Sequence, residues 1–196
     1  MAVPRVAGPL LAAIAATTAW LKQASVPAAV IGGVAASLLG RPRVTKDVDL
    51  IAIVEDDDVS RFLLIGREHG FEPRVADAIA FAKVSRVLLL RHEPSGIEID
   101  LSIAILPFER EIIERAVERS VRGVSFRLAT AEDIVVMKAI ALRPRDIADI
   151  ESILAAGHEL DLTRIRGLLK IFTEALETDD FSGEFERLLA RHRRGS

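Results

Sequence analysis

The chain of 196 residues lacks cysteine and tyrosine and has a single tryptophan. Without cysteine it forms neither a disulfide bond nor a cysteine-ligated metal site. The scarcity of aromatic side chains leaves few platforms for stacking bases, so any bound nucleic acid would be held through its phosphates. The formal net charge of −3 gives no strong global attraction to nucleic acid, but it leaves room for a local basic groove.

The sequence also lacks a hydrophobic run long enough to span a membrane. Residues 6–23 resemble the apolar part of a signal peptide, but a single arginine, Arg5, precedes them, and Thr17, Thr18 and Lys22 interrupt them. We therefore expect an alanine-rich, mostly buried first helix and no membrane partner. A cytoplasmic location is expected, and the absence of cysteine is compatible with it.

What the sequence does contain is a composition typical of a folded globular protein, with 50% hydrophobic and 28% charged residues. Residues 1–128 mix strand and helix patterns. The expected strands are 28–33, 47–54, 86–92, 96–106 and 123–129, and the expected helices are 8–24, 34–40, 56–70 and 107–119. The last of these helices would turn Ile112, Ile113, Ala116 and Val117 inward.

Residues 129–196 have a purely helical pattern. Thr130 and Asp133 have the spacing of a helix N-terminal cap, Pro144 suits the first turn of the next helix, and Gly157 suits its end. Helices are expected near 161–176 and 180–193, and the final RHRRGS as a frayed tail. The expected fold class is α/β (α+β). A small mixed sheet flanked by helices forms a core at 1–128, and a helical part at 129–196 packs on it, either as a separate part or as one domain with the core.

Two aspartates, Asp47 and Asp49, begin the otherwise apolar strand 47–54. Alternate residues of a strand share a face, so the two carboxylates would point the same way, with Cα atoms about 6.5–7 Å apart. Like charges so close are tolerated when solvent or a cation neutralises them. On its own the pair also fits ordinary aspartates at a loop-to-strand junction.

A second acidic strand strengthens the cation interpretation. In GIEIDLSIAI, Glu98, Asp100 and Ser102 occupy the face opposite the isoleucines and leucine. If this strand lies beside the first, Asp100 completes a cluster of carboxylates suited to Mg²⁺ or Mn²⁺, which take substrate phosphates as further ligands. The solvated face of an edge strand would have the same pattern.

A glycine pair, Gly32-Gly33, lies between the first expected strand and the following helix. Residues without Cβ let a phosphate approach backbone N–H groups, and the helix N-terminus favours its negative charge. The pair matches neither a P-loop nor a dinucleotide-binding motif, and glycine pairs most often mark simple turns.

The order of these elements, a glycine pair, then RVTKDVD, then an isolated strand aspartate, resembles the DNA polymerase β-like nucleotidyltransferase superfamily. Within it, the sequence looks like the AbiEii-type toxin nucleotidyltransferases. The later stretch EDIVVMKAIALRPRDIADI carries the lysine and aspartate of that pattern, Lys138 and Asp146, with Asp149 one turn on. The resemblance covers roughly residues 28–154. Glycine stands at Gly33 where the superfamily often has serine, which removes one hydroxyl contact to phosphate.

The resemblance implies the following site. Asp47 and Asp49 would bind the metals, and Asp100 would ligate the catalytic metal and help deprotonate the acceptor hydroxyl. Nucleotide contacts would come from Gly32, Gly33, Arg43, Thr45 and Lys138, with Asp146 orienting the lysine or contacting the nucleotide. Arg43 and Thr45 would alternate with the aspartates on the same strand face.

Each of the later residues also has an ordinary structural explanation. Lysines such as Lys138 are mostly solvated, and the helix dipole favours an acid at Asp146. A base-stacking ring would have to come from Trp20, Phe81, Phe108 or Phe126, and the sequence does not choose among them.

The implied activity is transfer of a nucleoside monophosphate from an NTP to a hydroxyl acceptor, with pyrophosphate release and Mg²⁺ or Mn²⁺ as cofactor. The toxin group implies a tRNA end or a protein as acceptor and a cognate antitoxin as partner. Arg41, Arg43 and Arg91 could hold an RNA backbone, or they could be plain surface arginines. Two alternatives remain, namely a non-catalytic nucleotide- or partner-binding module and a small-molecule nucleotidyltransferase.

Overall fold

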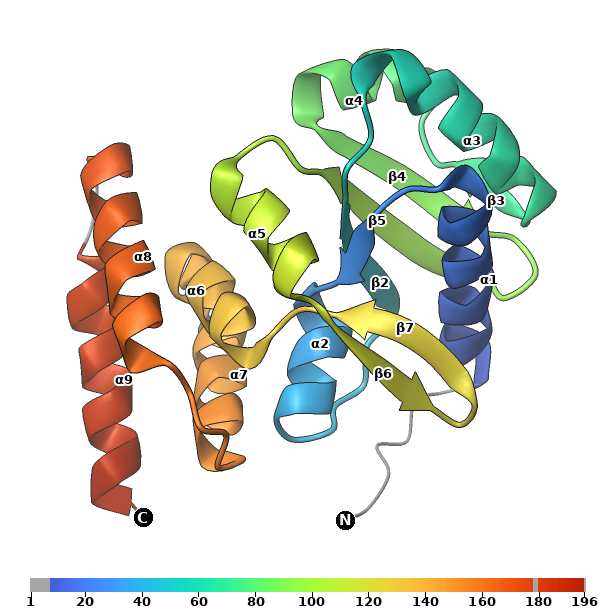
Figure 1. Cartoon of the computed structure of the whole chain (residues 1–196). Helices are drawn as coiled ribbons and strands as arrows, with labels where there is room; N and C mark the ends of the chain where they lie inside the picture. Colours follow the sequence, from blue (N-terminus) through green and yellow to red (C-terminus); the bar gives the residue numbers. More distant parts are fainter. Residues whose placement is uncertain (1–7, 178–179, 196) are drawn as a thin grey trace. The chain divides into compact units, whose positions relative to one another are not determined.

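The computed structural model describes residues 8–177 and 180–195, which form a seven-stranded mixed sheet and a set of helices (Figure 1). The α/β fold class expected from the sequence is confirmed, including the helical C-terminal part. The chain divides into two compact units. The first unit comprises the chain up to Val34 together with Val44–Ala129, and the second comprises Ala35–Arg43 together with the chain from Thr130. The division into domains at residue 128 stays a prediction.

The first unit contains every strand of the sheet and the helices that flank it. Its elements are α1 (Gly8–Ala24), β1 (Ala28–Val30), the start of α2 (Gly32–Leu39), β2 (Asp47–Ala52), the short 3-10 helix η1 (Asp56–Asp58), α3 (Val59–Glu68), β3 (Phe71–Pro73), α4 (Ala78–Ser85), β4 (Val87–His92), β5 (Ile97–Ile103), α5 (Pro107–Arg115), β6 (Val117–Val121) and β7 (Val124–Leu128).

The strands are ordered β3-β4-β5-β2-β1-β7-β6. The pairs β2–β5 and β1–β7 are parallel, and the remaining neighbours are antiparallel. The central strand β2 therefore has the acid-bearing β5 as its parallel neighbour. This is the adjacency on which the predicted carboxylate cluster depended.

One face of the sheet is mostly apolar and forms the core of the first unit, with the buried His92 of β4 as a polar member. Val48 and Leu50 of β2 are at most 1% exposed and pair with equally buried residues of β5. Helix α1 contributes Trp20, whose ring stacks on Phe62 of α3 at 4.2 Å and on Phe71 of β3 at 4.9 Å between ring centroids. Helix α1 is thus attached to the core by one side, but only five of its 17 residues are buried, fewer than expected. No described helix is long and apolar enough to span a membrane.

The second unit is built from helices and the end of α2. Its further elements are α6 (Ala131–Ala141), α7 (Pro144–Ala155), α8 (Leu162–Leu176) and α9 (Phe181–Gly195). The predicted start of α6 and the predicted start and end of α7 are confirmed. Thr130 caps α6 by accepting a hydrogen bond from the Asp133 N–H at 3.3 Å, and Gly157, with φ of +76°, follows α7.

Four details of the expected layout are wrong or incomplete. Helix α5 ends at Arg115, so Val117 belongs to strand β6 and its side chain is 42% exposed instead of buried. Strand β3 and helix α4 were not expected at all. The C-terminal tail, expected to be frayed, continues α9 to Gly195.

Candidate active site

The acidic face of the first unit consists of Asp47, Asp49, Glu98 and Asp100. The parallel register of β2 and β5 places Asp47 opposite Glu98 and Asp49 opposite Asp100, so all four side chains project from the same side of the sheet. This side is opposite the apolar core face. Asp47 is exposed and the other three are half-buried, so water reaches a group of like charges that would be too costly in a dry interior.

The glycine pair lies directly against this face. The backbone N–H of Gly33 donates a hydrogen bond to Oδ2 of Asp49 at 3.2 Å, and the Ile31 N–H donates to the Asp49 carbonyl at 3.0 Å. Gly32 has φ of +62°, and a Cβ there would overlap the Asp49 carboxylate. Glycine is therefore required because α2 begins against an aspartate, which the sequence-based expectation of a phosphate seat did not foresee.

A further residue of the acidic face, Arg74, has no sequence signal. It follows β3, and its guanidinium donates to Glu98 at 3.1 Å, to Asp100, and to the Leu90 carbonyl at 3.1 Å. Arg91 of β4 donates to the other oxygen of Glu98 at 3.1 Å. The acidic face thus combines four carboxylates with two guanidinium groups and keeps a formal negative surplus.

The oxygen-only donor set of the acidic face fits Mg²⁺ or Mn²⁺ in chemistry and in register. Its side chains do not form a ready cluster, because no three acidic or histidine side chains of the described residues lie together as a metal-binding group. Asp49 contacts the Gly33 N–H, and Asp100 is paired with Arg74. Binding a divalent ion would therefore require side-chain rearrangement.

The pKa of Asp100 is raised above its ordinary value. Burial against the sheet is the main cause, and the charges of Asp47 and Glu98 add to it. The Arg74 guanidinium acts in the opposite direction, but it does not cancel the effect of burial. A raised carboxyl pKa is the property expected of a group that accepts a proton.

The second unit contains a separate set of ionised groups, the buried charge cluster of Arg43, Lys138, Asp146 and Asp149. The Lys138 Nζ lies 3.0 Å from Asp146 and 2.7 Å from Asp149, and the Arg43 guanidinium forms a bidentate pair with Asp149 at 2.9 and 3.0 Å. The lysine and both aspartates have side chains at most 12% exposed. Within these four groups two cations balance two anions, and the exposed Arg143 also lies 3.8 Å from the second oxygen of Asp146.

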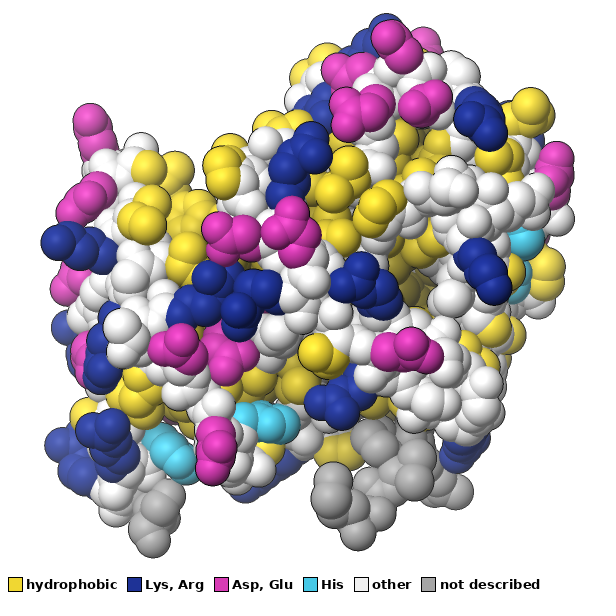
Figure 2. Space-filling model, viewed as in Figure 1, with side chains coloured by type: hydrophobic (Ala, Val, Ile, Leu, Met, Phe, Trp, Pro, Cys, Tyr) yellow, Lys and Arg dark blue, Asp and Glu magenta, His cyan; other side chains and the backbone are white. Residues whose placement is uncertain are grey.

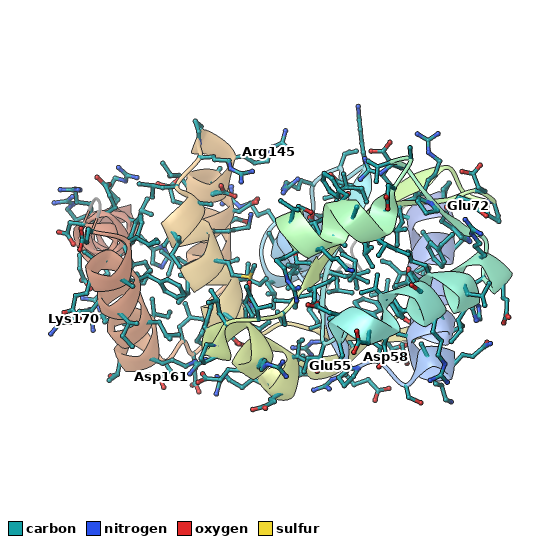
Figure 3. The ribbon with its side chains drawn as sticks, turned by 90° about the horizontal axis from the view of Figure 1, so that it is seen from above. Glu55, Asp58, Glu72, Arg145, Asp161 and Lys170 are labelled. Carbon is teal, nitrogen blue, oxygen red and sulfur yellow. The ribbon has the colours of Figure 1, made fainter. Side chains whose placement is uncertain are left out.

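Asp149 links the two cations of this cluster. Burial by itself would raise its pKa, but the hydrogen bonds from Arg43 and Lys138 outweigh burial, so the pKa lies below its ordinary value. The neighbouring Arg145 is exposed and points away from α7 (Figure 3).

The structure corrects the expected positions of Arg43 and Thr45. Strand β2 begins at Asp47, so both residues precede the strand and do not share its face with the aspartates. Arg43 belongs to the second unit, where its backbone N–H donates to Oγ of Ser37 at 3.0 Å. Thr45 is half-buried in the segment that leads into β2.

Two cavities of the structure have different linings, one mainly apolar and one with charged side chains. A cavity of about 290 Å³ in the first unit lies between α1 and the apolar side of β1 and β2, and Figure 2 shows a hollow with a hydrophobic floor beside α1. It has no carboxylate in its lining. A groove of about 510 Å³ in the second unit is lined by Arg41, Pro42 and Arg43 and by residues of α7, including Asp149 and Ser152.

The four candidate base-stacking rings fall into a buried pair and a solvent-accessible pair. Trp20 is enclosed by Phe62 and Phe71, and its Nε1 donates to the Phe62 carbonyl at 2.9 Å, while Phe126 is 4% exposed. Both rings are core residues and are not accessible to a base. Phe81 is 38% exposed and Phe108 is partly exposed, so these two remain candidates.

Comparison with known proteins identifies the type of fold and family. A family model described as a nucleotidyl transferase of unknown function (DUF2204) matches residues 11–188. No curated protein gives a significant match.

Three solved structures share the fold. An antigenic nucleotidyltransferase-like protein from Paracoccidioides brasiliensis has a TM-score of 0.56 at 19% identity, over 87% of this chain and 90% of that chain. ANT(2")-Ia in complex with adenylyl-2"-tobramycin has 0.57 at 17% identity, over 85% and 98%. The lincosamide antibiotic adenylyltransferase LnuA, bound to lincomycin, has 0.50 at 12% identity, over 71% and 93%. At such identities the likeness extends to the fold alone.

Proposed function

The chain belongs to this family of nucleotidyl transferases, and from that premise we propose that it is a metal-dependent enzyme acting on an NTP. The reaction moves a nucleoside monophosphate to a hydroxyl acceptor. The acceptor oxygen attacks the α-phosphorus, the bond to the pyrophosphate leaving group breaks, and the acceptor proton is lost. The observation that carries this proposal is the shared face of Asp47, Asp49 and Asp100 on adjacent parallel strands.

The proposed roles follow the chemistry of each group. Asp47, Asp49 and Asp100 would hold Mg²⁺ or Mn²⁺, which supplies charge neutralisation for the phosphates and activation of the hydroxyl when bound. Asp100 is also proposed to help remove the proton of the acceptor hydroxyl. Gly32 and Gly33, at the start of α2 beside Asp49, are proposed to help seat the triphosphate.

Lys138 is proposed as a phosphate contact. Its ammonium has three donors, and Asp146 and Asp149 engage it at two points. One donor therefore remains for a phosphate oxygen, while the two aspartates fix its direction. Arg43 and Thr45 are proposed as nucleotide-contacting residues in the segment that leads into β2, with Arg43 anchored through Asp149.

For the acceptor we propose a tRNA end or a protein hydroxyl, as in the AbiEii-type toxin nucleotidyltransferases, with a cognate antitoxin as partner in the cytoplasm. The groove lined by Arg41 and Arg43 supports an RNA acceptor through Arg41, because a guanidinium group pairs with phosphate, whereas that of Arg43 is already paired with Asp149. A small-molecule acceptor is the second candidate. The fold likeness to ANT(2")-Ia with adenylyl-2"-tobramycin and to LnuA with lincomycin favours it.

The decisive experiment incubates the protein with each α-labelled NTP and Mg²⁺ or Mn²⁺, in parallel with total RNA, cell-lysate protein and a panel of aminoglycosides and lincosamides. Label in RNA or protein supports the toxin-like enzyme, and label in an antibiotic supports the second candidate. An Asp47→Asn/Asp49→Asn double variant is the control and should transfer none. If the folded parent labels nothing, the enzyme proposal fails and a nucleotide-binding module takes its place.

A further inference from the structure

We propose that Arg74 acts as an internal counter-cation of the acidic face and competes with a divalent ion for Asp100. This inference rests on the proposed function, because it assumes that the acidic face binds the ion used in nucleotidyl transfer. It assigns Arg74 a positioning role that no sequence pattern indicates. In the absence of nucleotide, Arg74 keeps Asp100 engaged and lowers the affinity for metal.

The position of Arg74 is fixed by several contacts. Its backbone N–H donates to the Leu89 carbonyl at 2.9 Å, and its Nε donates to the Leu90 carbonyl at 3.1 Å. Its two terminal nitrogens reach Glu98 and Asp100 separately. With three side-chain donors engaged and the side chain 23% exposed, the guanidinium is a built part of the acidic face and not a mobile surface group.

The target of Arg74 distinguishes it from the other arginine nearby. Arg91 contacts Glu98 through its opposite oxygen, has a side chain 47% exposed, and has no bond to Asp100 in the described structure. Arg74 alone bridges Glu98 and the predicted catalytic aspartate. The two arginines therefore form a matched pair in which charge and location are similar and the contact to Asp100 differs.

The bridge has a consequence for the order of binding. A divalent ion that takes Asp100 must separate it from Arg74 and must also approach a positive group, which opposes binding. The phosphates of an NTP supply negative charge that offsets this repulsion and offer the guanidinium new acceptors. We therefore expect the metal to bind weakly by itself and much more tightly together with nucleotide.

The test measures Mn²⁺ binding to the full-length protein without nucleotide, by electron paramagnetic resonance of the free ion and by calorimetry. Arg74→Gln removes the positive charge that opposes the ion and releases Asp100, so this variant should bind Mn²⁺ at least about fivefold more tightly than the parent. Arg91→Gln should change the affinity less than about twofold. In Arg74→Gln, addition of a non-hydrolysable NTP analogue should tighten Mn²⁺ binding far less than it does in the parent.

Further variants keep the proposal open to contradiction. Arg74→Lys retains the charge but not the fork, so it should bind Mn²⁺ with an affinity between those of the parent and Arg74→Gln. Asp100→Asn added to Arg74→Gln should cancel the gain in Mn²⁺ affinity.

Equal gains from Arg74→Gln and Arg91→Gln would show a general charge effect and overturn the proposal, as would no gain in either variant. If the gain is absent while the parent still transfers nucleotide, the inference alone fails. If the gain is present while no acceptor is labelled, the metal competition stands and the proposed enzyme fails.

Discussion

The acidic face of the first unit and the buried charge cluster of the second unit use the same chemical groups in opposite balance. The acidic face has four carboxylates against two guanidinium groups and is partly open to water. The buried charge cluster has two of each sign, with three of its four side chains nearly inaccessible. A surplus of charge in contact with solvent favours binding of a counter-ion, whereas a balanced buried set stabilises a conformation.

The largest expected effect is on the stability of the buried charge cluster. Asp149→Ala leaves Lys138 and Arg43 without their shared carboxylate, and breaking a buried pair costs about 3–5 kcal/mol. Urea unfolding monitored by circular dichroism measures the loss. Arg145→Ala, on the exposed side of the same helix (Figure 3), is the control and should change stability by less than about 0.5 kcal/mol. A loss below about 1 kcal/mol for Asp149→Ala would remove the contrast between the two regions.

The next largest effect is on activity at the acidic face. Asp49→Asn removes a charged ligand at half-buried Asp49 and should lower nucleotidyl transfer at least about a hundredfold, comparable to the loss of one charge-stabilising group in other enzymes. The free energy of unfolding should change by only about 1 kcal/mol, within the usual range for point variants. Asp58→Asn, at the exposed carboxylate labelled in Figure 3, should leave transfer unchanged. Transfer by Asp49→Asn at the parental rate would refute a catalytic acidic face.

A smaller effect is expected at Gly32, where the positive φ and the contact with Asp49 both disfavour a side chain. Gly32→Ala places a Cβ at positive φ and against the Asp49 carboxylate, so both transfer and stability should fall, with stability lower by more than about 1 kcal/mol. Gly96→Ala has a similar φ of +69° but open space around the new Cβ. Gly96→Ala should therefore lower the free energy of unfolding because of its positive φ, but it should leave the transfer activity unchanged. Equal activity in the two variants would contradict a functional contact between Gly32 and Asp49.

The smallest effect is a difference in pH dependence. The pKa of Asp149 is lowered in the fold, so its stabilising contribution is present above the ordinary carboxyl range and is lost as the pH falls through the folded pKa. The pKa of Asp100 is raised, so stability instead decreases as the pH rises from the ordinary value to the folded one. The stability gap between the parent and Asp149→Asn should therefore shrink on acidification, and the gap for Asp100→Asn should change in the opposite sense. Thermal unfolding from pH 3 to 7 checks both, and parallel trends would contradict the assignment.

Much of the acidic face was predictable because it depends on strand periodicity. The alternation in DVDLIA and IEIDLSI fixes which residues share a face, and the sheet confirms that the two strands are neighbours. Helices with a clear cap or an amphipathic pattern, such as α6, α7 and α8, were also predictable.

The missing parts lack local signals. Strand β3 has three residues and includes Pro73, which cannot donate to a sheet, and β6 has only Val121 buried, so neither has an apolar alternation. Helix α4 is hydrophobic on most sides and shows no clear helical stripe. Arg74 acquires its role only through tertiary pairing with Asp100, and Arg43 through pairing with Asp149. Periodicity contains no information about such distant partners.

The parallel pairing of β2 with β5 also means that the acidic face can form only late in translation. Parallel neighbours cannot be joined by a tight turn, and here η1, α3, β3, α4 and β4 intervene. When β2 has been synthesised, two of the acids are present but the strand that aligns them is not. Arg43 is likewise synthesised 106 residues before its partner, Asp149. The nascent protein therefore passes most of its elongation with its chemistry unassembled, and a chain interrupted before β5 would be inert.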